Sequence, residues 1–406
     1  MATTIDAQAR PAPRGLVPLL LTIVPFSQIP LDAYTPALPE MVRSLQADPA
    51  AVQNTVTAYM LGMSLALIPV GLITDAVGRR VTLFSGMALL VAMSLACAAV
   101  SDVTLLLAFR FLQGMGGCTC LVVSYVVAAD CFRGAHLTSV SGLLGAAWGL
   151  APVLAPAAGG VLADFVSWRV IFLLIGGLAS LVAVIAFFRL PETLPPARRV
   201  PIDLRAAGGV IATALRNRLF LCFTLIFGAM ASAQLVFGVV APFLYQEGLG
   251  FSPSGYGAMA LLLGGVNLAG ELGCSYFAKR TTPQRLGWTS YALFLAGAVG
   301  LAVSGVMWGA GLFSITLGGA LVLLGCGVLC PMMYGMALGL FERNLGLLGG
   351  LISAICYLCV SAAMMAAAVL PETSQAPMGA LYVGLGLVGG GLLALSLPGA
   401  RSAGHP

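Results

Sequence analysis

Histidine and lysine are scarce in this chain, and each shortage excludes a class of function. The only histidines, His136 and His405, lie outside the long apolar runs, so we expect no histidine-based metal centre or proton relay inside those runs. The only lysine, Lys279, follows Ala278, which excludes the Gly-Lys-Ser/Thr sequence of a nucleotide-binding P-loop. We therefore expect neither a metal nor another cofactor, and the energy for any work must come from an ion gradient.

Charged residues are also scarce, at 8% of 406 residues, whereas hydrophobic residues make up 60% and the mean hydropathy is +1.02. A soluble globule of this size cannot hide that much apolar surface. The apolar runs are continuous over about twenty residues, which favours membrane-spanning helices over barrel strands, whose polarity alternates. Such runs recur to the end of the chain, which excludes a cleaved signal followed by a soluble domain. We therefore predict an all-α integral membrane protein.

Twelve apolar runs are long enough to cross a bilayer, near residues 16–38, 52–74, 81–100, 104–128, 137–163, 168–189, 219–243, 255–278, 286–305, 311–338, 347–369 and 378–397. The only long polar stretch divides them into two groups of six. We predict an N-terminal six-helix bundle at 1–190, a cytoplasmic linker at 191–218 and a C-terminal six-helix bundle at 219–406. The weakly amphipathic segment from Pro201 to Arg218 either lies along the membrane surface or forms a solvated linker.

The distribution of basic residues predicts how the chain is threaded. With twelve alternating crossings and an internal N-terminus, all but three of the nineteen basic residues fall in cytoplasmic segments, leaving Arg43 and Arg169 outside and Arg110 within a helix. The positive-inside rule therefore places both termini in the cytoplasm of a bacterium, with the chain in its inner membrane. The net charge of +5 reflects this topology, so the expected partner is the lipid bilayer and no nucleic acid is expected.

Three ionisable residues inside the runs are the candidates for proton coupling. Arg110 is the only basic one, and burying an unpaired guanidinium costs roughly 2.5 to 3.5 kcal/mol, so it indicates a pathway or coupling site. Asp32 and Glu271 are the acidic residues that lie away from the loop ends. Burial favours the protonated carboxyl group and a nearby arginine favours the ionised one, so each can change protonation as its surroundings change. The alternatives are that Asp32 only caps or hydrogen-bonds a helix and that Glu271 forms a structural pair with Lys279 or another group.

Small residues form a stripe along the fifth run. They recur at steps of three or four and so share one helix face, where a neighbouring helix can pack closely and two prolines allow a bend. The stripe indicates either a moving interface or simple tight packing. We call it the helix-packing stripe, and with the adjoining Gly160 it consists of Gly145, Gly149, Pro152, Pro156, Gly159 and Gly160.

The segment between the second and third runs resembles the signature loop of the major facilitator superfamily, apart from Ala76, where a basic residue is usual. The resemblance implies twelve transmembrane helices in two pseudo-symmetric six-helix bundles. It also implies a conformational latch in which the arginines contact acidic groups or helix C-termini on neighbouring helices. The alternative is that the arginines only anchor the topology. The latch residues are Gly71, Asp75, Gly78, Arg79 and Arg80.

Further motifs resemble particular groups within that superfamily. The segment 110–116 is similar to the fourth-helix motif of proton-coupled members, and 156–160 to the end of the antiporter motif, with Ala151 and Ala155 in place of glycines. The stretches 32–39, 168–172 and 191–193 resemble the Bcr/CflA type of drug:proton antiporter. The resemblance covers nearly the whole chain, although the second half matches less distinctively.

The resemblance implies a substrate site near the membrane midplane, between the two bundles. Candidate residues are polar or aromatic groups at suitable depth, because aromatic faces attract cations. Any of the tyrosines can instead serve only packing. The candidates are Asp32, Tyr34, Tyr59, Gln113, Tyr125, Gln234, Asn267, Tyr334 and Tyr357.

We therefore expect a monomeric, proton-coupled secondary transporter that exports drug-like or amphipathic small molecules by alternating access. A dedicated exporter of one metabolite, such as a siderophore or metallophore, would use the same architecture. A polytopic membrane enzyme using Cys356 and Cys359 is an alternative of another class, but cysteine inside a lipid-embedded helix is most often packing material. A receptor or scaffold of the same fold would tolerate neutralisation of Arg110.

Overall fold

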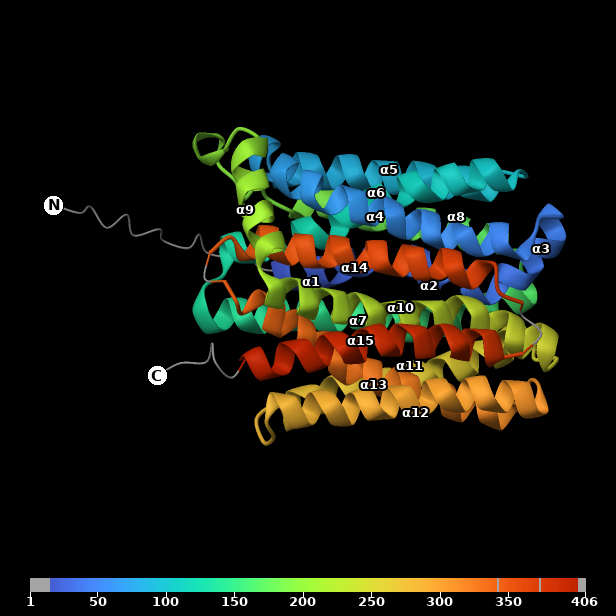
Figure 1. The fold of residues 1–406 in the computed structure, drawn as a ribbon. Coiled ribbons are helices and arrows are strands. Elements are labelled where there is room, and N and C mark those ends of the chain that lie inside the picture. The colour runs from blue at the N-terminus through green and yellow to red at the C-terminus, as the bar shows by residue number, and fades with distance from the viewer. Residues whose placement is uncertain (1–14, 342, 372–373, 401–406) are drawn as a thin grey trace.

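The computed structural model describes residues 15–341, 343–371 and 374–400, and these residues form helices and connecting turns without strands. Twelve of the helical segments are long and apolar enough to cross a membrane. The predicted all-α membrane fold is therefore confirmed (Figure 1). The first half begins with a broken crossing and continues with α4 (Pro49–Val77), α5 (Arg79–Ala99), α6 (Val103–Cys131), α7 (Gly134–Phe165) and α8 (Trp168–Arg189).

The second half contains six further crossings, which follow the short turn η3 (Pro196–Arg198) and the helix α9 (Leu204–Arg216). These crossings are α10 (Arg218–Phe243) with its terminal π-turn η4 (Leu244–Gly248), α11 (Pro253–Phe277), α12 (Pro283–Trp308), α13 (Leu312–Leu338), α14 (Leu345–Ala368) and α15 (Ala376–Ala400). Several helices begin at a polar cap, because a side-chain oxygen satisfies a first-turn N–H group that has no partner within the helix. Asp48 accepts such a bond at the start of α4, and Asp102 does so at the start of α6.

The first crossing extends further than its apolar run predicted, from Leu16 to Leu45 rather than 16 to 38. It consists of α1 (Leu16–Ile23), η1 (Val24–Ser27), α2 (Ile29–Asp32), η2 (Thr35–Ala37) and α3 (Leu38–Leu45). Prolines start each segment after the first, because proline lacks an N–H donor and crowds the preceding helical turn. The breaks leave backbone carbonyls near the middle of the membrane free to accept other donors.

The two ends of the bundle differ. At one end, here called the linker end, α9 lies across the other helices near the turn between α4 and α5, whereas α3 lies at the opposite, far end (Figure 1). The amphipathic segment predicted at Pro201 to Arg218 is thus helical over the shorter range of α9. Ala207 and Ala214 are buried where α9 contacts α10 and α14 of the second half, while Leu204 and Leu215 are exposed.

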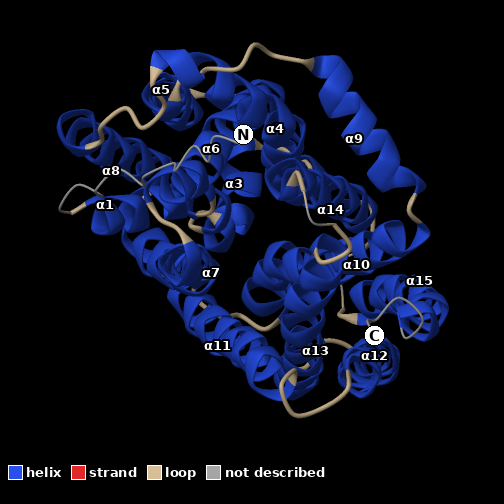
Figure 2. Cartoon of the chain, turned by 90° about the vertical axis from the view of Figure 1, so that its left-hand side faces the viewer, coloured by secondary structure: helices blue, strands red, loops and turns tan. Residues whose placement is uncertain are grey.

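Two helix pairs form most of the contact between the halves, α4 with α14 and α7 with α11, as the view from the linker end shows (Figure 2). The first crossing adds contacts of α3 and η2 with α10 and of η2 with α11. Near mid-length, the Ser64 hydroxyl donates to the carbonyl of Ala354 at 2.9 Å. At the far end, Gln246 Nε2 donates to the carbonyl of Pro36 at 2.7 Å. These hydrogen bonds join the two halves from the middle of the membrane to the far end.

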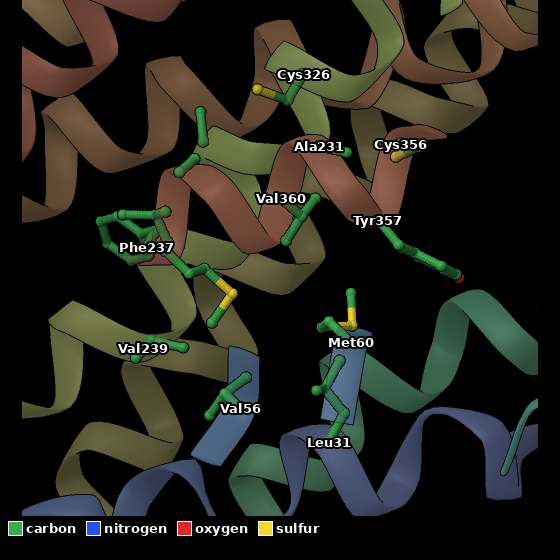
Figure 3. Packing of buried hydrophobic residues seen from close by; sticks show 14 of the residues in the cluster. Leu31, Val56, Met60, Ala231, Phe237, Val239, Cys326, Cys356, Tyr357 and Val360 are labelled. Carbon is green, nitrogen blue, oxygen red and sulfur yellow. The ribbon is translucent and has the colours of Figure 1, made fainter. Parts of the chain in front are cut away.

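Apolar side chains fill the interface between these two hydrogen bonds. Val56 and Met60 of α4 lie opposite Val360 of α14, with Val239 of α10 beside them (Figure 3). All four are buried, with exposed fractions of 5% or less. Such packing excludes water, so it closes the interface toward the far end.

Candidate functional site

Arg110 is surrounded by aromatic rings of the first half. It lies in α6, and none of its surface is exposed. Its guanidinium carbon is 4.5 Å from the ring centroids of both Tyr34 and Tyr59, and 5.6 Å from that of Phe172. Aromatic faces attract a desolvated cation by about 2 kcal/mol. The rings therefore offset part of the cost of holding this charge inside the membrane.

Hydrogen bonds fix the orientation of the Arg110 guanidinium. Nη1 donates to the carbonyl of Pro30 at 2.9 Å and to Oε1 of Gln113, while Nε donates to the carbonyl of Thr55 at 3.3 Å. Gln113 Nε2 in turn donates to the Ser94 hydroxyl at 2.7 Å. Nη2 is buried without a hydrogen-bond partner. The guanidinium thus keeps one nitrogen, with two N–H groups, unpaired, while its other N–H groups bind neutral oxygens.

Asp32 lies where the first crossing contacts the second half. It is 8% exposed, and one of its oxygens, Oδ2, is buried without a hydrogen-bond partner. Tyr256 of α11 and Tyr357 of α14 are both close enough to interact electrostatically with it. Asp32 and Arg110 form no ion pair, although the carbonyl that Arg110 binds is only two residues before Asp32.

Tyr34 and Tyr59 hold Arg110 and do not line an open space. Both side chains are completely buried in the first half. The Tyr34 hydroxyl shares a 2.8 Å hydrogen bond with Thr55 Oγ1, and the Tyr59 hydroxyl donates to the carbonyl of Ser27 at 2.8 Å. Gln113 is likewise fully buried. These three substrate candidates therefore belong to the surroundings of Arg110.

Glu271 pairs with another polar group and not with Lys279. Asn267 Nδ2, one helical turn earlier in α11, donates to Glu271 Oε1 at 3.0 Å. Across the residues described, the only ion pairs are those of Arg79, so Lys279 does not pair with Glu271. Glu271 is half-buried. It is consequently a carboxyl group inside a membrane-spanning helix with no basic partner.

Tyr125, Tyr334 and Tyr357 lie where the halves meet. Tyr125 of α6 and Tyr334 of α13 are close enough to interact electrostatically, and so are Tyr334 and Tyr357. One of these three substrate candidates thus comes from the first half and two from the second. Gln234 is half-buried in α10 and, within the described chain, forms no hydrogen bond with any of them.

Arg79 is the centre of the latch region. Its Nη1 is 2.8 Å from Asp75 Oδ1, and its Nε is 2.9 Å from Asp130 Oδ2. The Thr193 hydroxyl donates to the same Asp130 oxygen at 2.6 Å. Asp130 was not among the sequence candidates, because its position at the end of α6 suggested only a helix terminus. Gly71, one turn before Asp75, has no heavy atom within 4 Å of where a Cβ would be.

The polar linker is attached to the same region. Glu192 accepts hydrogen bonds from the backbone N–H groups of Arg79 at 3.0 Å and Arg80 at 3.1 Å, which cap the start of α5. Gly78 has a φ of 112°, and a Cβ there would lie 2.7 Å from a Glu192 oxygen, so only glycine fits. The N–H group of Val200 donates to the carbonyl of Asp75 at 3.1 Å.

Arg80 contacts the end of another helix. Its guanidinium donates to the carbonyl of Phe187 at 2.9 Å and to that of Leu190, which are at the C-terminus of α8. A cation there interacts favourably with the negative end of the helix dipole. The two latch arginines therefore join α4, α5, α6 and α8, all within the first half.

The helix-packing stripe of α7 faces two neighbours. A Cβ at Gly159 would overlap the carbonyl of Ala33 in the same half, and one at Gly160 would lie 2.5 Å from the carbonyl oxygen of Pro253 in α11. Pro152 and Pro156 lie inside the helix. Toward the linker end, the Cβ positions of Gly145 and Gly149 leave normal contact distances of 3.5 Å and 3.7 Å. The stripe is therefore tight at the far end and looser toward the linker end.

Within the described residues, cysteine and histidine form neither a disulfide nor a metal-binding cluster. All ten cysteines are free thiols, nine of them buried, and no group of three metal-binding side chains is present there. His136 is exposed in the first turn of α7, and His405 lies outside the described residues.

Comparison with known proteins defines the class to which this fold and site belong. The family model of the Major Facilitator Superfamily matches residues 21–367. The chain therefore belongs to the major facilitator superfamily. It is a multi-pass membrane transporter for small molecules and not an enzyme.

Individual relatives show which members of the superfamily the chain is similar to. It is 31% identical to the multidrug resistance protein MdtL of Escherichia coli (strain K12) over 316 residues, which are 78% of each chain. It is 33% identical to the MFS-type transporter YdgK of Bacillus subtilis (strain 168) over 225 residues, 55% of this chain and 56% of YdgK.

Solved structures share the fold at lower sequence identity. A bacterial homologue of the lysosomal transporter Spinster superposes with a TM-score of 0.68 at 14% identity, covering 94% of this chain and 96% of that one. The human organic anion transporter MFSD10 (TETRAN) superposes with a TM-score of 0.63 at 18% identity, covering 93% and 97%.

Proposed function

We propose that this transporter exports drug-like or other amphipathic small molecules in exchange for protons, by alternating access between its two halves. The similarity to MdtL, a multidrug resistance protein, supports a drug-like substrate class. The motifs at 32–39, 168–172 and 191–193 support placement with the Bcr/CflA-type antiporters. A dedicated exporter of one metabolite is the competing proposal.

The observation that carries the proposal is the unpartnered Oδ2 of Asp32, buried between the halves. An isolated ionised carboxyl group is costly to bury, so Asp32 is better retained either protonated or beside a cation. Moving Asp32 toward water or toward Arg110 favours loss of the proton, and moving it into the apolar interface favours uptake. Asp32 is therefore the proposed proton carrier, and Arg110 the fixed charge that couples to it.

Contacts between the halves support a state closed at the far end and accessible from the linker end. The packing around Val56 and Met60 and the close approach of Gly160 to Pro253 both lie toward the far end. We propose that the linker end faces the cytoplasm of a bacterial cell, because the basic residues of the linker lie there. Both termini are then cytoplasmic, and the chain functions as a monomer in the inner membrane.

The latch contacts are proposed to favour one of the two conformations. The ion pairs of Arg79 link α4, α5 and α6, so a shift of α4 against its neighbours must stretch or break them. One elementary charge moved through 100 mV supplies about 2.3 kcal/mol, comparable to a few such contacts. One proton moved by the gradient therefore supplies enough free energy to break these latch contacts.

The test is transport in proteoliposomes with an imposed pH gradient, using a panel of dyes, antibiotics and metal chelators. Wild-type protein is compared with Asp32→Asn and with Asp164→Asn, the same chemical change at an exposed residue near the far end of α7. Asp32→Asn should abolish gradient-driven transport, and Asp164→Asn should retain it. For a neutral or anionic substrate the Asp32 variant keeps binding, whereas for a cation it loses binding too. Transport of some compound without any dependence on the pH gradient would refute proton coupling.

A further inference from the structure

Glu271 occupies a specific place in the contact between α7 and α11. Farther toward the far end, the Cβ position of Gly264 in α11 is 3.2 Å from Val153 of α7, which is tight packing. About two turns nearer the linker end, Glu271 Oε2 lies 3.7 Å from the Cβ position of Gly149. One half thus provides a carboxyl group and the other a bare glycine backbone. Glu271 therefore lies in the interface between the halves, on the linker side of the tight contact.

The carboxyl group of Glu271 has one neutral partner and no counter-charge. Asn267 donates to Oε1 at 3.0 Å, and the Asn267 Oδ1 atom is buried near the Cβ position of Gly327 in α13, at 3.2 Å. That packing directs the amide N–H group toward Glu271. The side chain is half-buried and not enclosed, so Oε2 remains the oxygen available to a ligand. A carboxyl group placed in a membrane without a cation gains most from a ligand that carries one.

Aromatic residues from both halves border the same region. The Tyr125 hydroxyl is 3.5 Å from the Cβ position of Gly145, one turn from Gly149 on the same face of α7. Tyr125 and Tyr334 are close enough to interact electrostatically. The Tyr334 ring also packs against Phe227, with centroids 5.7 Å apart. Aromatic rings beside a carboxyl group fit a compound with a positive charge on an apolar, ring-containing body.

We propose that Glu271 recognises the positive charge of lipophilic organic cations and makes them the preferred substrates of this transporter. This inference rests on the proposed export function: Glu271 makes the first contact with the cation, and Asp32, deeper in the interface, exchanges that cation for a proton. Asp32 precedes Ala33, whose carbonyl lies against Gly159 in the tight part of α7, whereas Glu271 lies beside Gly149, nearer the accessible linker end. A cation entering from the linker end therefore meets Glu271 first, and Asp32 remains the proton carrier.

The test compares a cation with a neutral compound in the same proteoliposomes. The probes are ethidium and the neutral calcein acetoxymethyl ester, and the proteins are wild type, Glu271→Gln and Glu271→Asp. Glu247→Gln is the matched control, because Glu247 is exposed in η4 at the far end of the same half. We expect Glu271→Gln to raise the ethidium concentration for half-maximal transport at least about tenfold, the loss that removal of a charge-assisted contact implies. Transport of the neutral ester and the ratio of protons exchanged per substrate should stay unchanged.

Other outcomes separate the possible failures. Glu271→Asp should recover most ethidium transport, because it restores the charge. Equal loss with both probes, or unchanged ethidium transport in Glu271→Gln, overturns the inference while leaving drug export intact. Loss of proton exchange without a change in cation preference assigns Glu271 to proton transfer and also overturns the inference.

If wild-type protein moves only the neutral ester, cations are not the substrates. If it moves neither probe and no other drug-like compound, the proposed export function itself fails. Size-exclusion elution and thermal stability of each variant must match wild type.

Discussion

Replacing Gly160 with alanine should shift the transporter toward a state in which its far end is open. The added Cβ would lie 2.5 Å from the Pro253 carbonyl oxygen and 3.2 Å from the Gly257 Cα, whereas ordinary contact begins at 3.4 Å. The helices α7 and α11 must therefore separate by about 0.9 Å, which brings the distance between the new Cβ and the Pro253 oxygen from 2.5 Å to 3.4 Å. Overpacking of this kind costs about 1 to 3 kcal/mol. That cost falls only on the conformation in which these helices are in contact, so the equilibrium should move by about fivefold to about a hundredfold.

Gly149→Ala is the matched control for this change. It lies on the same stripe, and its Cβ would meet Glu271 at an ordinary distance of 3.7 Å. Both substitutions replace a helical glycine with alanine, so the gain in helix propensity is the same and cancels in the comparison. Any difference between the two variants then reports the contact with Pro253.

Spin labels on either side of the far end provide the assay. Cysteines introduced at Asp164 in α7 and Ser254 in α11 can be labelled after Cys359, the one native cysteine that is not fully buried, is replaced. Double electron–electron resonance should show a larger long-distance population in Gly160→Ala than in wild type or Gly149→Ala. An unchanged distribution in Gly160→Ala, or the same shift in both variants, would refute the argument that this contact closes the far end.

Three further predictions concern other regions. Arg110→Lys keeps the charge but loses the planar guanidinium that lies over the rings of Tyr34 and Tyr59. Transport should therefore fall at least about tenfold at unchanged protein yield. Near-normal transport would show that the charge alone is sufficient. Thr193→Val removes a 2.6 Å hydrogen bond to Asp130. The free energy of unfolding should fall by about 1 kcal/mol, and Tm should fall by about 2 °C in a detergent melting experiment. A stability equal to that of wild type would mean that the bond contributes nothing. The double variant Cys356→Ala and Cys359→Ala should retain transport in proteoliposomes, since packing is the role assigned to these thiols, and a loss of transport at normal yield would contradict that role.

Composition and run length were sufficient to predict the twelve crossings, because the bilayer requires long apolar helices whatever their neighbours are. The bounds of the first crossing could not be predicted in the same way. Its apolar pattern ends near residue 38, but α3 continues to Leu45 with Glu40 and Arg43 in its turns. Whether such charged turns remain helical depends on packing beneath them, where Leu38 and Met41 are buried.

The candidate site was only partly predictable. A single charge in an apolar run identifies Arg110, but its bonds to the carbonyls of Pro30 and Thr55 depend on where three helices meet. Tyr256 was missed because an aromatic residue near the start of a crossing usually indicates an interface anchor. The bond from Asn267 to Glu271 was detectable, since the two residues are four apart in one helix, whereas Lys279 is eight away.

The attachment of the linker limits how far the halves can move apart at their linker end. Residues up to Val200 are tied to the first half through the bond to Asp75, and α9, which begins at Leu204, is buried against the second half from Ala207 onward. Between that hydrogen bond and the start of α9 only residues 201–203 are free to extend, and they span about 10 Å when fully extended. A wider displacement must separate α9 from α10 and α14 or break the hydrogen bond between Val200 and Asp75. The connection between the halves thus behaves as a short tether whose length sets the largest opening through which a substrate can enter.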